Sequence, residues 1–180
     1  MCLEKHFSNI EDFRRPQGLR HTKSQMFGMI IISNLCGHFG GRPIARFTKY
    51  YKSTFENALQ LKFPPPSHVS FSTFINSIDE AQMITAFNNW TAELIPLKAG
   101  EPISGDGKAL GSTLNNACNS KQDFQAIVSL FCQQSGLVYA FERYRNGKAS
   151  EANVIRFLLH QLKDMGVTFF LDALHTQKKQ

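Results

Sequence analysis

The chain has 180 residues, of which 42% are hydrophobic, and this length and composition predict one globular domain or two small ones. Its 20 basic and 14 acidic residues give a formal charge of +6, which suits a nucleic-acid partner but also occurs in proteins without one. The four cysteines include no C-x-x-C pair and no histidine at zinc-ligand spacing, so we expect idle thiols in a reducing cytosol.

No secretory signal and no membrane span are predicted. Residues 1–6 lack the apolar core of a signal peptide. The most apolar run, residues 26–36, is shorter than the roughly 20 residues that cross a bilayer. We therefore expect a cytoplasmic protein without a membrane partner.

The first half of the sequence predicts helices. Ser24 is expected to cap a helix that continues to Leu35, and this helix is apolar nearly all round, which is typical of a buried central helix. Glycines then break the chain. Pro43 is expected in the first turn of the next helix, residues 44–51, where its missing N–H costs nothing.

A run of prolines separates these helices from the next two. Residues 64–66 are all proline and interrupt the chain stiffly. Ser67 or Ser70 is expected to cap the helix that follows. A further helix is predicted at about residues 80–94.

From about residue 97 the pattern changes to a mixture of strands and helix. Residues 124–132 and 137–141 are predicted to form a hairpin. A helix capped by Ser150 follows, with one apolar face, and Gly166 is expected to end it. Residues 168–171 predict a short strand buried on both faces.

Two aspartates each end a predicted strand. Asp106 closes a strand that begins near Pro102, and Asp172 closes the strand at residues 168–171. A helix that connects two strands of one sheet makes them parallel, and ligands gather at the carboxyl ends of such strands. Two close carboxylates repel each other unless a cation lies between them, and Mg²⁺ binds few carboxylates together with water and phosphate oxygens. The pair indicates a metal site for phosphodiester chemistry; alternatively, Asp106 starts a turn and Asp172 caps a helix.

Three short motifs surround these aspartates in a set order. They are Asp106-Gly107-Lys108 before a Ser/Gly-rich stretch, Lys148-Ala149-Ser150-Glu151 after the hairpin, and Asp172-Ala173 with Gln177 after a short spacer. With this order and spacing, the sequence resembles the DDE transposases of the ISAs1 insertion-sequence family, which are related to the H-repeat-associated proteins. The helices of the first half resemble the helical domain that precedes the catalytic domain in this family. Two positions depart from the family pattern, namely Val69, where an acidic residue is usual, and Ser150, where asparagine is usual.

The resemblance implies an α+β chain with two domains. Residues 1–97 would form a helical, DNA-binding domain, and residues 98–180 a truncated RNase H-like α/β domain whose mixed sheet follows the order strand, hairpin, helix, strand. Asp106 and Asp172 would be the first two of three catalytic carboxylates that hold Mg²⁺ or Mn²⁺. The third, a glutamate, lies well downstream in full-length members, and this chain ends at Gln180.

The function that the resemblance implies is DNA transposition. Mg²⁺-dependent hydrolysis at the ends of an insertion sequence would precede attack of a 3′-hydroxyl on target DNA, and the partners would be terminal repeats, target DNA and further copies of the chain. We expect a truncated copy with little strand transfer of its own. The alternatives are a non-catalytic DNA-binding or regulatory fragment, and a decayed gene product whose exposed apolar surface aggregates.

Other residues are candidates for contacts with DNA or metal. The densest basic cluster is expected either to contact the DNA backbone or to be a solvated face, and it consists of Arg14, Arg15, Arg20, His21 and Lys23. Lys108 is close enough to Asp106 to contact a phosphate. Glu151 could assist the metal site or a phosphate contact, or it could be an acid favoured by the positive end of its helix.

Overall fold

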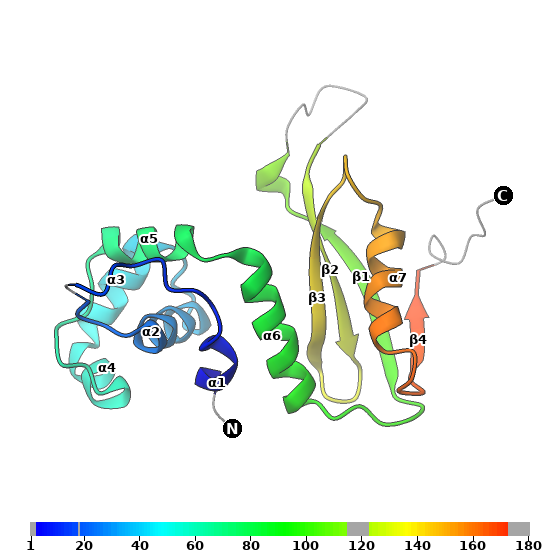
Figure 1. Cartoon of the computed structure of the whole chain (residues 1–180), viewed down its shortest axis with the longest axis horizontal. Coiled ribbons are helices and arrows are strands. Elements are labelled where there is room, and N and C mark those ends of the chain that lie inside the picture. The colour runs from blue at the N-terminus through cyan, green and yellow to red at the C-terminus, as the bar shows by residue number, and fades with distance from the viewer. Residues whose placement is uncertain (1–2, 18, 115–122, 173–180) are drawn as a thin grey trace. The chain divides into compact units, whose positions relative to one another are not determined.

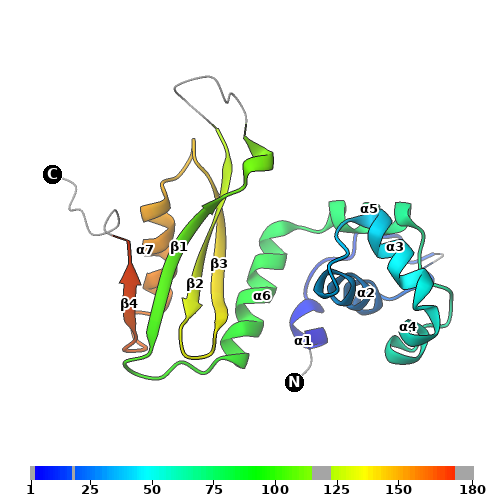
Figure 2. The same cartoon turned by 180° about the vertical axis from the view of Figure 1, so that it is seen from behind.

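The computed structural model describes residues 3–17, 19–114 and 123–172, which form seven α-helices and one four-stranded mixed sheet (Figures 1 and 2). This mixture of helices and strands was expected from the sequence. Two compact units divide at Ala86 and Phe87, within helix α6 (Glu80–Leu94). None of the described helices is both long and apolar enough to cross a membrane.

The first unit is helical. Besides the first part of α6, its helices are α1 (Leu3–Phe7), α2 (Lys23–Leu35), α3 (Gly41–Tyr50), α4 (Lys52–Leu59) and α5 (His68–Ser77). Pro43 lies in the first turn of α3 and Ser67 caps α5, as expected; the Ser67 hydroxyl accepts the Ser70 N–H at 3.3 Å. The predicted cap at Ser24 is wrong.

Helix α2 begins one residue before Ser24, at Lys23, because Thr22 caps it. The Thr22 hydroxyl accepts the Gln25 N–H at 3.2 Å, and the Gln25 side chain accepts the Thr22 N–H at 2.9 Å. This reciprocal pair satisfies two N–H groups that the first turn leaves without helical partners. Because this capping box forms two hydrogen bonds, the helix starts after Thr22 and Ser24 lies inside its first turn.

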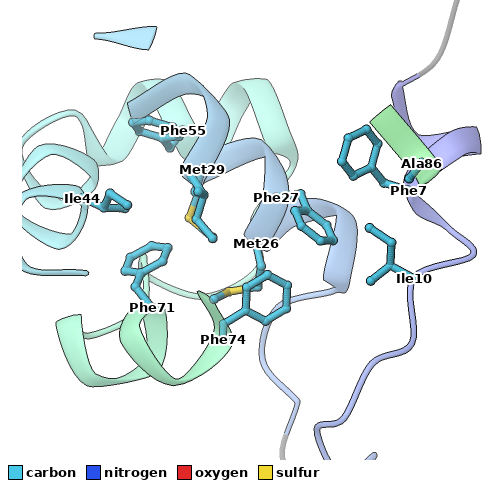
Figure 3. Packing of buried hydrophobic residues seen from close by; sticks show 11 residues of the cluster. Phe7, Ile10, Met26, Phe27, Met29, Ile44, Phe55, Phe71, Phe74 and Ala86 are labelled. Carbon is cyan, nitrogen blue, oxygen red and sulfur yellow. The ribbon is translucent and has the colours of Figure 1, made fainter. Parts of the chain in front are cut away.

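The core of the helical unit is rich in phenylalanine and methionine. Phe71 and Met29 are fully buried, and the rings of Phe27 and Phe74 meet edge to face with centroids 5.2 Å apart (Figure 3). Such aromatic pairs add to the stabilisation from apolar burial. Helix α2 is central but not buried all round, since Leu35 in its last turn is 82% exposed.

The second unit is built on the sheet. Its strands are β1 (Pro102–Ala109), β2 (Gln125–Cys132), β3 (Leu137–Arg145) and β4 (Thr168–Leu171). The strand order is β3-β2-β1-β4, with antiparallel β1–β2 and β2–β3 pairs and a parallel β1–β4 pair. The expected hairpin is therefore present, and the last strand returns beside the first.

Helix α7 (Glu151–Gln161) connects β3 to β4 and covers one face of the sheet (Figures 1 and 2). Ser150 caps it, as expected, by accepting the Asn153 N–H. Val154, Ile155 and Leu158 are buried on its inner side and form a core with residues of β1, β2 and β3. Burial of these apolar side chains stabilises the packing of α7 on the sheet.

Three expectations for this unit are wrong. Strand β1 continues through Asp106 to Ala109, so Asp106 neither ends a strand nor starts a turn. Helix α7 ends at Gln161, and turns follow before Gly166, whose φ of 63° belongs to the connection to β4. Strand β4 is not buried on both faces, because Phe170 is 53% exposed.

Side chains of α6 form hydrogen bonds with the backbone of β3, an edge strand of the sheet. The Asn88 amide donates to the Phe141 carbonyl and accepts the Phe141 N–H, both at 3.0 Å. The Thr91 hydroxyl donates to the Tyr139 carbonyl. Helix α6 therefore covers an edge whose open hydrogen-bonding groups would otherwise be available to another strand.

A buried carboxylate lies beside the start of β1. Glu101 accepts the Lys98 N–H at 3.0 Å and the Cys132 S–H at 2.8 Å. These two hydrogen bonds, first the one from Cys132, lower the pKa of Glu101 below its ordinary value. Cys132 is itself buried, which agrees with the idle thiol expected from the sequence.

We predict that Asn88→Ala destabilises the sheet unit by about 1–3 kcal/mol, because two hydrogen bonds to the edge strand are lost. Asn89→Ala is the matched control, since Asn89 is the exposed next residue of the same helix. Chemical denaturation of both variants checks the prediction. Equal stabilities of the two variants would contradict it.

Candidate functional site

The parallel pairing of β1 with β4 brings the two candidate aspartates together. The last paired residues are Gly105 and Leu171, and one step further along each strand lie Asp106 and Asp172. Neighbouring strands are about 4.8 Å apart, and successive side chains alternate between the two faces of a sheet. Asp106 therefore lies on the face opposite Gly105, and a register continued by one residue would set Asp172 beside it; both aspartates are exposed.

Glycine at position 105 allows the strands around this site to pack closely. A Cβ there would lie 2.8 Å from Cδ2 of Leu171 and 3.4 Å from Cδ2 of Leu130. Both leucines cover Gly105 on the side of the sheet that carries α7. Because side chains alternate, Asp106, one residue further along β1, belongs to the opposite face, which α7 does not cover (Figure 2).

Lys108 and Ser129 belong to the face of the sheet that carries Asp106. Lys108 follows Asp106 by two residues, so it points to the same face, and Ser129 of β2 is paired with Asp106. Within the described residues, no cation forms an ion pair with either aspartate, and no group of three or more His, Cys, Asp or Glu side chains could hold a metal ion. Two exposed carboxylates fit Mg²⁺, which completes its coordination with water and phosphate oxygens.

Glu151 lies close to Asp106 along β1 but on the other face of the sheet. A Cβ on Gly107 would lie 2.5 Å from Oε2 of Glu151, so this carboxylate packs directly against the backbone of Gly107. The Tyr144 hydroxyl donates to Oε2 at 3.5 Å. Burial and then the Glu151 charge raise the pKa of Tyr144. Glu151 is therefore not brought onto the aspartate face.

Two members of the predicted basic cluster make contacts within the fold. Arg14 donates to both oxygens of Asp12, at 2.8 and 2.7 Å, and its guanidinium lies 5.0 Å from the centre of the Phe74 ring. The hydrogen bonds from Arg14 lower the pKa of Asp12. The Lys23 ammonium donates to the carbonyl of Ser8 at 2.6 Å and also to that of Ile10. These cations fix the N-terminal segment to the unit.

His21 also has a structural position. It is only 7% exposed, and its Nε2 donates to the Pro64 carbonyl at 3.0 Å, while Nδ1 has no partner among the described residues. Burial lowers the pKa of His21 from its ordinary value of 6.5. Arg15 and Arg20 are the two members of the cluster whose side chains remain exposed.

The structure contains a second set of cations that we did not predict. A groove of about 810 Å³ runs between α3 and the segment Pro64–His68, and basic side chains line it. Three of them, Arg42, Arg46 and Lys49, belong to α3 at spacings of four and three residues. That spacing places side chains on one helix face, so it is the sequence pattern from which these cations could have been predicted.

The third sequence motif is only partly visible. Asp172 is described, whereas residues 173–177 of that motif lie outside the described residues. The described surroundings of Asp172 are therefore those formed by β4 and β1.

The helical unit is similar to a known protein family. Residues 4–91 match the family model described as DDE_Tnp_1-associated, which supports a transposase-associated family and a transposase-related role. The match covers the helical unit and ends before β1, so it does not include Asp106 or Asp172. No curated protein matches the chain.

We predict that His21 makes the helical unit less stable as the pH falls from 7 towards 5. Because burial lowers the folded-state pKa of His21, the unfolded chain binds a proton more readily in this range, and stability rises with pH. His21→Gln should reduce the slope of stability against pH by at most about 1.4 kcal/mol per pH unit. Denaturation of both proteins across this range tests the prediction, and parallel pH profiles would contradict it.

Proposed function

We propose that the sheet unit is part of an RNase H-like catalytic domain and that the protein acts in DNA transposition as an insertion-sequence transposase of the ISAs1 family. The observation that carries this proposal is the parallel β1–β4 register, whose last pair, Gly105 with Leu171, comes one residue before Asp106 and Asp172. Two carboxylates in this arrangement suit a divalent metal ion and a phosphodiester substrate.

The topology of the sheet supports the proposal. Three antiparallel strands are followed by α7 and by a fourth strand that lies parallel to the first. The strands and helix of the RNase H-like domain implied by the sequence resemblance follow the same order. The match of residues 4–91 to a transposase-associated family supports the proposal independently, because it rests on a different part of the chain.

The residues of the site would have separate roles. Asp106 and Asp172 would hold Mg²⁺ or Mn²⁺, and Lys108 on the same face would contact a phosphate of the substrate. The bound metal would activate water or a 3′-hydroxyl and stabilise the leaving oxygen. The partners would be the ends of the insertion sequence, target DNA and further copies of the chain.

A second candidate function is DNA binding without catalysis. The exposed basic groove on α3 favours it, since that groove is present in the helical unit whatever the aspartates do. A chain that bound DNA without cutting it would compete with an active transposase for the same ends.

We predict that Asp106→Asn and Asp172→Asn each weaken Mn²⁺ binding at least about tenfold, because each removes one of two ligand carboxylates. The measurement is Mn²⁺ paramagnetic resonance on the full chain with duplex DNA present, followed by a cleavage assay on DNA from the flanks of its gene. Asp164→Asn is the control, since Asp164 is an exposed aspartate in the turns after α7.

Wild-type affinity for Mn²⁺ in Asp106→Asn would overturn the metal site. Metal binding that depends on both aspartates, without any cleavage of DNA, would favour the non-catalytic candidate.

A further inference from the structure

The basic groove of the helical unit has two unlike walls. One wall is the outer face of α3 and the start of α4, with Arg42, Arg46, Lys49 and Lys52. The other is the segment that leads into α5, from the three prolines to His68. Among the described residues that line the groove, none is acidic.

The cations of α3 form one stripe on the helix surface. Arg42, Arg46 and Lys49 are four and three residues apart, and residues at these spacings lie one above another on a helix. The inner side of the same helix is buried through Ile44 and Thr48. At 1.5 Å per residue, the stripe from Arg42 to Lys49 is roughly 10 Å long.

These three side chains form no ion pair within the described part of the chain. They are exposed, and in the part of the chain that the structure describes no acidic side chain lies within ion-pair distance of them. Lys52 differs, because it pairs with Glu56 at 3.6 Å. The stripe thus contrasts with Arg14 and Lys23, which are satisfied by Asp12 and by backbone carbonyls.

The groove is held in shape by rigid parts of the chain. Each proline of the opposite wall has a fixed φ. Helix α3 approaches α5 so closely at Gly41 that a Cβ there would lie 2.7 Å from the His68 carbonyl oxygen. The two walls are therefore fixed relative to each other before any ligand binds, which lowers the cost of ordering them.

We propose that this groove binds the phosphate backbone of duplex DNA. A line of separate, exposed cations matches a row of phosphates, which are spaced about 3.4 Å apart per strand along the helix axis, so the stripe spans about three of them. A single small anion would instead need groups that converge on one point. The identity of the polyanion as DNA rests on the proposed function, whereas the groove and its charge do not.

The test replaces the three α3 cations together. The variant Arg42→Gln/Arg46→Gln/Lys49→Gln keeps good helix formers at each position, and circular dichroism checks that it folds. Binding of the full chain to a fluorescent duplex of arbitrary sequence is followed by anisotropy over a range of potassium chloride concentrations. We expect affinity at moderate salt to fall about tenfold or more and the slope of log K against log salt to become shallower by about 2–3.

The matched control removes three charges from the other unit. It is Lys148→Gln/Arg156→Gln/Lys163→Gln, whose positions are all exposed. We expect this control to leave the salt slope nearly unchanged. An equal loss in both triple variants would overturn the proposal, because it would mean that only net charge matters.

Two further arms separate the alternatives. Arg15→Gln/Arg20→Gln tests the exposed remainder of the cluster predicted from the sequence, and a larger loss there than in the α3 variant would overturn the groove as the main contact. Polyglutamate replaces DNA as the probe for an acidic protein partner, and groove-dependent binding of polyglutamate without binding of DNA would also overturn the proposal.

The proposal for the groove and the proposal for the metal site can be contradicted independently of each other. If Mn²⁺ binding proves independent of the aspartates while the α3 variant still loses DNA, only the proposed catalysis fails. If Mn²⁺ binding depends on them while the α3 variant binds DNA like the wild type, only the groove proposal fails.

Discussion

The parallel pairing of β1 with β4 is the constraint on which the candidate site depends. Because side chains alternate along a strand, a slip of one residue in this register would turn Asp172 towards α7 and away from Asp106. Two features oppose such a slip. Leu171 packs over Gly105, where no side chain competes for the space, and α7 is attached to the sheet through buried residues such as Leu158. Packing on one face of the sheet thereby determines which charges meet on the other.

The basic residues of the helical unit fall into two groups, those that contact other groups of the fold and those that remain exposed. Where basic residues are dense in the sequence, three of the five make contacts inside the fold: Arg14 with Asp12, and Lys23 and His21 with backbone carbonyls. Where they are spaced along one helix, as Arg42 and Arg46 are, they stay in solvent. Periodicity on a helix is thus a better guide to a charged surface than the number of cations in a short stretch.

Local signals predicted the elements of the fold well, and longer-range contacts decided where those predictions failed. Ser150 was predicted as a cap, and Ser67 was one of two predicted candidates, because the capping interaction is complete within four residues. The end of α7 was placed too late because Gly166, in a left-handed conformation, serves the turn into β4. The pairing of Asn88 with the edge of β3 spans 53 residues, so no local pattern could indicate it. The parallel pairing of β1 with β4 could be predicted from topology, because a helix that connects two strands of one sheet makes them parallel.

The hydrogen bond from Cys132 to the buried carboxylate of Glu101 has a practical consequence. Of the two cysteines that the structure describes, Cys36 is exposed and Cys132 is buried in the sheet core. An alkylating reagent can reach Cys36 in the native state, whereas Cys132 reacts only when β2 separates from its neighbours. The rate at which Cys132 is alkylated, measured by mass spectrometry, therefore reports the opening of the sheet unit, with the exposed Cys36 as an internal reference.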